Sequence, residues 1–243
     1  RQIIKVSIGG IGQNLIATSS WIGLMRIVST FGSEAVAGYT IGIRIIIFSL
    51  LPSWGISNAA ATLVGQNLGA KQPERAERSV WVTGKINAVF LGSLGVIFIM
   101  FPTFFIELFI KDPNVVESGV ACLRIISYGF MMYGFGMVMV QSFNGAGDTA
   151  TPTKINLISF WMIEIPLAWF LAKVAGMEQD GVYVAIVVAE TIMTILAIWL
   201  FRKDRPRELS IPMTSPVDFI SGLRKMDSSG NLLNGSTASF TAT

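Results

Sequence analysis

The chain has 243 residues, of which 52% are hydrophobic and only 14% are charged, and its mean hydropathy is +0.61. Because an ordinary soluble protein carries roughly 25% charged residues, this composition excludes a typical water-soluble fold. The net charge of +3 would suggest nucleic acid if the basic residues formed one face, but they cluster at the ends of apolar segments, where a bilayer surface explains them better.

The residues that commonly perform hydrolytic chemistry are missing. The sequence has no histidine, and Cys122 is its one cysteine. Zinc hydrolase, Ser-His-Asp and Cys-His sites are therefore excluded, as is a disulfide within the chain. We predict that the protein is not an enzyme and has no catalytic residue and no metal site.

Six apolar segments are each long enough to cross a hydrocarbon core, which requires about 20 residues. They cover residues 6–25, 35–64, 86–106, 125–147, 155–172 and 181–201. The sequence thus predicts an all-α integral membrane protein, with a six-helix domain over residues 1–208. Residues 209–243 are rich in Ser, Thr, Gly and Asn, and we predict a mostly disordered tail there.

Lys and Arg are distributed unequally between the two sides that six spans define. Thirteen fall at the termini and in the connections on the same side as the termini, against four on the other side. The thirteen are Arg1, Lys5, Lys71, Arg75, Arg78, Lys85, Lys154, Arg202, Lys203, Arg205, Arg207, Arg224 and Lys225, and the four are Arg26, Lys111, Arg124 and Lys173. The positive-inside rule places both ends in the cytoplasm, with the chain in the cell (inner) membrane.

The second segment contains a row of small polar residues at helical spacing. They are Ser49, Ser53, Ser57, Asn58, Thr62 and Gln66. Such residues either hydrogen-bond neighbouring helices and allow close packing, as Gly38 and Gly42 would in a GxxxG pattern, or form the wall of a water-filled cavity. The segment ends at Gly65 and Gly69, and the charged run that begins at Pro73 predicts a short helix along the membrane surface.

Ionisable residues and prolines inside the spans are the next candidates for function. Glu164 and Glu190 are the two acids within apolar segments, and Arg44 is the one deeply placed base. Charge in a membrane is costly, so either acid could carry a coupling ion or proton, or could form a structural ion pair with Arg44. Pro52 and Pro166 each remove a backbone hydrogen bond, which predicts a kink in the second and fifth spans.

Further polar and aromatic residues are candidates for lining a cavity. The first segment provides Gln13, Asn14 and Thr18, and the fourth provides Tyr128, Tyr133 and Gln141. The fourth segment also holds four methionines, which either fill a core or bind apolar cations through soft contacts.

At the end of the fourth segment, Gly145 and Gly147 end the span, and Asp148 and Thr151 can cap the next helix.

Three stretches together resemble the C-terminal lobe of the multidrug and toxic compound extrusion (MATE) transporters. They are FGSEAVAGY at residues 31–39, LVGQNLGA with RAERSV at residues 63–80, and NGAGDTATPT at residues 144–153. The resemblance extends over roughly residues 5–205. It implies one six-helix lobe of a twelve-helix transporter, with a substrate cavity between the lobes.

The resemblance implies an antiporter that exports drugs or other organic, often cationic, compounds in exchange for Na⁺ or H⁺, with no further cofactor. The partners would be membrane lipid, a small-molecule substrate, and either an N-terminal lobe or a second copy of this chain. In vibrio-type members the coupling cation is held by acids at positions that fall near Ala17 and at Tyr133 here, and neither is acidic. Two alternatives are a lipid-linked oligosaccharide flippase of the same superfamily and a fragment that is inactive by itself.

Overall fold

The computed structural model describes residues 2–203, with side chains from Gly10 onward. The predicted tail over residues 209–243, and the last residues of the predicted domain, lie outside this range. Within residues 2–203 the chain forms helices and no strand, which confirms the predicted all-α class.

The helices follow one another with short connections. In chain order they are α1 (Gln2–Val28), η1 (Ser29–Phe31), α2 (Ser33–Gly69), α3 (Pro73–Met100), α4 (Pro102–Glu107), α5 (Pro113–Ser127), α6 (Phe130–Gly145), α7 (Ala150–Asn156), η2 (Leu157–Glu164), α8 (Ile165–Trp169), η3 (Phe170–Val174) and α9 (Glu178–Lys203). Elements α7 to η3 form one continuous helical span of 25 residues.

Length and hydropathy identify the helices that can cross a membrane. Among the described residues, α2, α3, the α7–η3 span and α9 qualify, and α5 with α6 forms a bent fifth span. Helix α1 is long enough, with 27 residues, but it has no 18-residue stretch as hydropathic as those of the four spans. Large apolar side chains point outward, including Ile22, Phe48 and Met162, each at least two-thirds exposed. A surface of this kind is suited to lipid rather than water.

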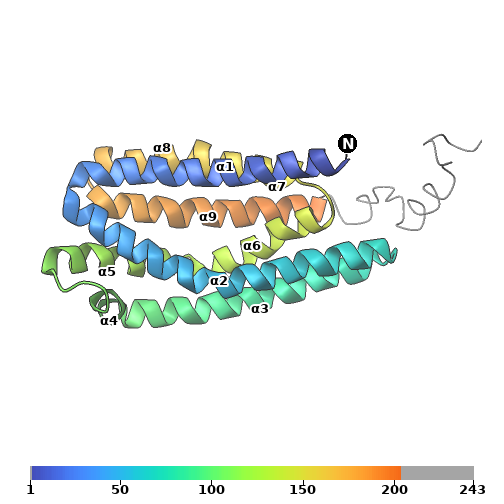
Figure 1. The fold of residues 1–243 in the computed structure, drawn as a ribbon, viewed down its shortest axis with the longest axis horizontal. Coiled ribbons are helices and arrows are strands. Elements are labelled where there is room, and N and C mark those ends of the chain that lie inside the picture. Colours follow the sequence, from blue (N-terminus) through green and yellow to red (C-terminus); the bar gives the residue numbers. More distant parts are fainter. Residues whose placement is uncertain (1, 204–243) are drawn as a thin grey trace, which may run out of the picture. The chain divides into compact units, whose positions relative to one another are not determined.

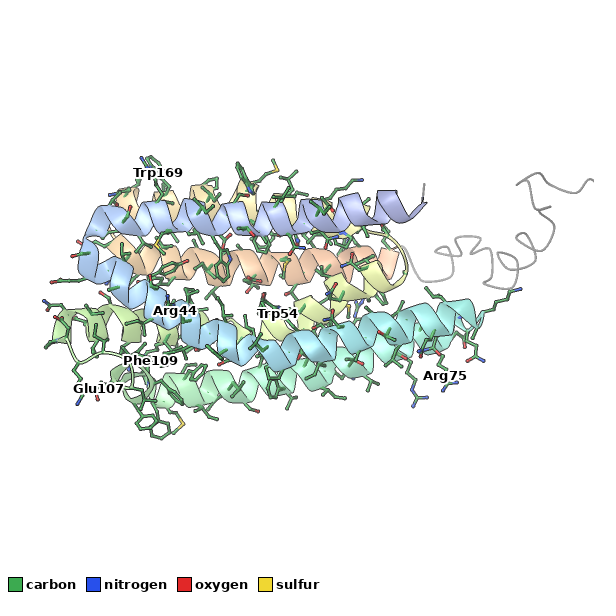
Figure 2. The ribbon with its side chains drawn as sticks, in the orientation of Figure 1. Arg44, Trp54, Arg75, Glu107, Phe109 and Trp169 are labelled. Carbon is green, nitrogen blue, oxygen red and sulfur yellow. The ribbon has the colours of Figure 1, made fainter. Side chains whose placement is uncertain are left out.

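The two ends of the described chain lie at the same end of the helical bundle. Figure 1 shows the start of α1, the α2–α3 connection, the α6–α7 connection and the end of α9 together there. Figure 2 shows Phe109 and Trp169 toward the opposite end, where both are more than half exposed. Exposed aromatic residues are typical of a membrane–water interface.

Close contacts between small residues hold α2 against α5. A Cβ atom added at Gly38 would lie 2.6 Å from the Cβ of Ser118, and one at Gly42 would lie 2.9 Å from the sulfur of Cys122. This confirms the packing interpretation of the GxxxG pattern. Helix α2 also packs against α3 and α6, whereas α1 packs mainly against the α7–η3 span.

The predicted surface helix at Pro73 is wrong. Pro73 begins α3, which continues to Met100 without a break. The reason is that Ala76, Val80 and Gly84 are buried at a spacing of four residues, so the charged run already has the apolar face of a packed helix.

The predicted fourth span, residues 125–147, has the wrong start. Helix α5 begins at Pro113, capped by Asp112, whose carboxylate accepts the N–H groups of Asn114 and Val115. The span then bends by 57° between α5 and α6. The sequence pattern predicted a loop here because charged residues interrupt the apolar run. These residues lie on the exposed face of α5, and the other face is buried.

The two prolines behave differently. Helix α2 runs through Pro52 and changes direction part-way along its length (Figure 1), as the kink prediction expects. At Pro166 the span is not broken but contains wider π-helical turns, η2 before the proline and η3 after it. In one of them the N–H of Ile165 reaches the carbonyl of Phe160, five residues earlier, so the wider turn takes up the change in hydrogen bonding that proline imposes.

Candidate functional site: an acidic cavity inside the helix bundle

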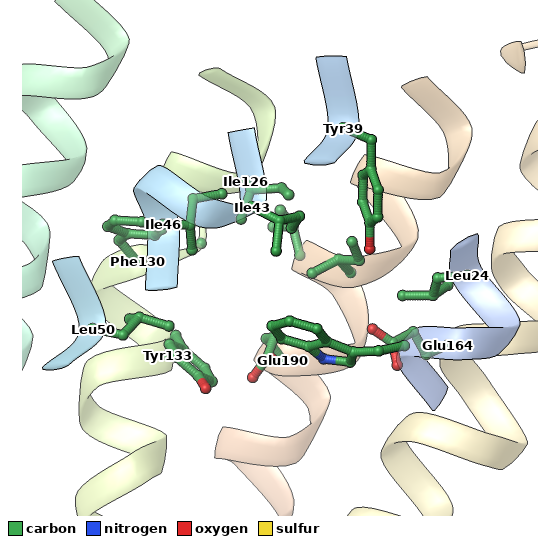
Figure 3. A pocket seen from close by; sticks show the side chains of 14 residues that line it. Leu24, Tyr39, Ile43, Ile46, Leu50, Ile126, Phe130, Tyr133, Glu164 and Glu190 are labelled. Atoms are coloured by element: carbon green, nitrogen blue, oxygen red, sulfur yellow. The ribbon is translucent and has the colours of Figure 1, made fainter. Parts of the chain in front are cut away.

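The candidate site is a cavity among α1, α2, α5, α6, η2 and α9. Its volume, counted to the open mouth, is about 580 Å³. Most of the lining side chains are aliphatic or aromatic, and Glu164 and Glu190 are the two with ionisable acidic groups. Figure 3 shows both glutamates reaching this cavity from different helices, with the Tyr39 and Tyr133 rings on its other walls.

Glu164 is the last residue of η2 and is only 3% exposed. Its Oε2 atom accepts a hydrogen bond of 2.5 Å from the Ser20 hydroxyl, which is fully buried on α1. This hydrogen bond joins α1 to η2 through two residues that are 144 positions apart in the sequence. It satisfies one oxygen of a carboxyl group that would otherwise be costly to bury.

Glu190 reaches the cavity from the middle of α9. Its Oε2 atom is buried and has no hydrogen-bond partner among the described residues. Thr194 donates to the backbone carbonyl of Glu190, not to its side chain. An unpaired buried oxygen carries a full desolvation cost, so a proton or a cation at this position would stabilise the site.

Of the residues predicted from the sequence to line a cavity, Tyr133 is the one that lines this cavity. Figure 3 places its hydroxyl group on the same side as the Glu190 carboxyl group. Tyr133 thus adds a hydroxyl group to a lining that is mostly apolar apart from the two glutamates.

Arg44 lies outside this cavity on an exposed face of α2 (Figure 2). Within the described part of the chain, no ion pair joins it to Glu164 or Glu190. The structure therefore offers no support for the structural ion pair that was the alternative to ion coupling.

Three other predicted residues come together in a separate chain of side-chain amides. Gln13 donates to Asn144 at 3.1 Å, Asn144 donates to Gln141 at 2.6 Å, and Gln141 donates to Asn58 at 2.9 Å. These side-chain hydrogen bonds link α1, α6 and α2, and Gln13 also donates to the backbone carbonyl of Thr149. None of these residues lines the acidic cavity.

The remaining cavity candidates do not join either group. Asn14 is exposed and donates to the Gly10 carbonyl on its own helix. Thr18 and Tyr128 are exposed, and Tyr128 lies at the bend between α5 and α6. Their role as cavity residues stays a prediction.

In the polar row of the second span, the packing interpretation holds for the buried serines, and the cavity-wall interpretation stays a prediction. Ser53 and Ser57 are fully buried, and the Asn87 side chain donates to Ser57 and to the Gly134 carbonyl, so these groups serve packing. Asn58 is exposed and belongs to the amide chain.

The motif at the end of α6 forms a tight connection. Helix α6 ends at Gly145, and Gly147 has a positive φ of 82°. Asp148 accepts the N–H groups of Ala150 and Thr151 and so caps α7. The predictions for Gly147 and Asp148 are confirmed. Thr151 was predicted to act as a second capping residue, but its backbone N–H instead donates to the Asp148 carboxylate.

Apolar, membrane-length helices around a cavity with sparse ionisable groups define a helical membrane protein. The sequence profile of the MatE family matches residues 11–170, and the chain therefore belongs to the MatE family. Members of this family are transporters and not enzymes.

Two curated relatives carry the name "Probable multidrug resistance protein NorM". The protein from Thermotoga maritima is 26% identical over 83% of this chain and 43% of its own length, and that from Caulobacter vibrioides is 27% identical over 82% and 42%. The chain thus spans less than half the length of these relatives.

Two solved structures show the same fold. The MATE transporter ClbM in complex with Rb⁺ matches with a TM-score of 0.80 and 21% identity, over 87% of this chain and 50% of that chain. A transporter of the MOP superfamily from Pyrococcus furiosus matches with a TM-score of 0.77 and 16% identity, over 83% and 45%.

Proposed function

We propose that the chain forms the C-terminal lobe of a MATE-type antiporter that exports organic, often cationic, compounds in exchange for Na⁺ or H⁺. Membership of the MatE family, the names of the curated relatives and the half-length match support this proposal. The other lobe would be the N-terminal half of the same transporter or a second copy of this chain. The lobe would lie in the inner membrane with both ends in the cytoplasm.

The acidic lining of the cavity is the observation that carries the proposal. Glu164 and Glu190 face one cavity, and no Lys or Arg is among its lining residues. Such a lining attracts a cation or a proton, which is what an antiporter of this type must bind. A flippase for a lipid-linked oligosaccharide would need cationic side chains to hold pyrophosphate, and Arg44, which lies outside the cavity, does not provide them.

Ion binding at this cavity would be coupled to helix contacts. The Ser20 hydroxyl donates a hydrogen bond to the Oε2 atom of Glu164. A proton or cation that binds to this oxygen therefore competes with the contact between α1 and η2. The Oε2 atom of Glu190 has no hydrogen-bond partner within residues 2–203 and so needs no contact to be broken there. Occupancy by the ion would therefore change the relative stability of two arrangements of α1 against the span that carries Glu164.

The test uses the full-length transporter reconstituted into proteoliposomes, with uptake of the organic cation ethidium as the readout. An imposed pH gradient and an imposed Na⁺ gradient are applied separately. We expect Glu164→Gln and Glu190→Gln to remove gradient-driven uptake while direct binding of ethidium persists, because glutamine keeps the side-chain size and removes the charge.

Glu107→Gln is the matched control, since Glu107 is exposed at the end of α4. It should transport like the wild type. Wild-type coupling in both cavity variants would reassign the two glutamates to structure, and ion-independent transport by the unmodified protein would contradict the antiporter proposal itself.

A further inference from the structure

A second hollow lies at the far end of the helix pair α2–α3, away from the acidic cavity. The last turns of α2 and the first turns of α3 enclose an open groove of about 1510 Å³, counted to its rim. One part of the groove is lined by Leu63 and Val82, and the other by Lys71, Arg75 and Arg78. The groove therefore joins an apolar wall to a basic one.

The basic part is suited to an anionic group. Lys71, Arg75 and Arg78 are all exposed, and Glu74 is the one acid beside them in the lining. Arg75 and Arg78 are three residues apart on α3 and so lie on neighbouring positions of one helix face. Among residues 2–203, the one hydrogen bond of the Arg75 side chain is a long contact of 3.5 Å with Gln72, so within this range most of its donors are available. Figure 2 shows the Arg75 side chain extending away from the helix pair.

The apolar part continues toward the membrane interior. Leu63 is 40% exposed and Val82 is 49% exposed, and Ile86, one turn further along α3, is 56% exposed. In a bilayer that α2 and α3 cross, these side chains would lie at the level of the lipid tails, and the arginines at the helix ends would lie at the level of the headgroups. The groove follows the order of a phospholipid, with the phosphate at the basic end and the acyl chains along the aliphatic side chains.

We propose that this groove binds an anionic phospholipid, whose phosphate contacts Arg75 and Arg78 and whose acyl chains lie along Leu63 and Val82. An acidic protein segment would match the charge but would leave the exposed apolar wall uncovered. The proposal does not depend on the transport function, since it requires only that α2 and α3 span a bilayer.

The experiment uses the purified full-length protein in nanodiscs of phosphatidylcholine that contain a small fraction of photoactivatable phosphatidylglycerol. Crosslinked peptides are identified by mass spectrometry, and photoactivatable phosphatidylcholine is the reference probe. We expect phosphatidylglycerol to crosslink preferentially within residues 63–82. Arg75→Gln and Arg78→Gln should each lower this preference about five-fold, which corresponds to the loss of one basic contact at an anionic surface.

Lys85→Gln is the matched control because Lys85 is an exposed lysine on the same helix that does not line the groove. It removes the same charge and should leave the preference unchanged. All three side chains are exposed, so the melting temperature should not change. Equal crosslinking of the two lipids, unchanged preference in both arginine variants, or an equal fall in Lys85→Gln would each overturn the proposal.

Discussion

The contact between α2 and α5 leads to a sharp prediction for Gly38→Ala. The new Cβ would lie 2.6 Å from the Cβ of Ser118 and 2.7 Å from the backbone nitrogen of Gly119. Backbone atoms cannot rotate away as the end of a flexible side chain can, so α2 and α5 would have to separate. Overpacking of this kind typically costs about 1–3 kcal/mol.

The magnitude is best measured against a second glycine on the same helix. Gly55 has no atom within 4 Å of an added Cβ, so Gly55→Ala gains only the helix propensity of alanine, about 1 kcal/mol. Gly38→Ala gains the same term, and the difference between the two variants isolates the overpacking. Since about 1 kcal/mol shifts the Tm of a domain of this size by roughly 2–4 °C, we expect Gly38→Ala to melt about 2–12 °C below Gly55→Ala.

Thermal unfolding of the detergent-solubilised protein, followed by tryptophan fluorescence, measures this difference. The wild type should melt about 2–4 °C below Gly55→Ala, and therefore between the two variants or close to Gly38→Ala. If Gly38→Ala and Gly55→Ala melted at the same temperature, the close approach of α2 to α5 would be refuted.

Two further predictions concern single side chains. Asp148→Ala removes the acceptor for the N–H groups of Ala150 and Thr151; it should cost about 1 kcal/mol of stability, and Asp148→Asn should restore most of it, as thermal unfolding will show. Cys122 is fully buried, so a maleimide reagent should modify the thiol only when the protein is unfolded in SDS, and rapid modification of the folded protein would contradict this burial.

Four of the spans, α2, α3, the α7–η3 span and α9, could be predicted from the sequence because their apolar length identifies them. The beginning of α5 was missed because Glu117 and Arg124 interrupt the apolar pattern, although only the exposed face of the helix carries them. A stronger signal was present in Asp112 followed by Pro113, a cap and a first helical residue. This capping signal predicts a helix start only when the residues that follow are known to have a buried face, as those of α5 do.

The candidate site could be predicted only in part. A rare acid in an apolar span points inward on energetic grounds, and this reasoning singled out Glu164 and Glu190. It could not identify Ser20 as the partner of Glu164, because that contact depends on how α1 and η2 are rotated about their axes. For the same reason, sequence could name Gln13 and Gln141 as polar candidates but could not connect them through Asn144.

The contacts at Gly38 and Gly145 involve main-chain atoms of the neighbouring helix, Gly119 in the first case and Ala61 in the second. Because main-chain atoms cannot move aside, positions at these helix crossings should tolerate fewer substitutions than exposed positions do. In a saturation mutagenesis library selected for stable folding, the two glycines should accept almost no replacement, whereas exposed apolar positions such as Phe48 should accept nearly any apolar residue. The pattern of surviving variants would then trace the helix crossings directly, without any structural measurement.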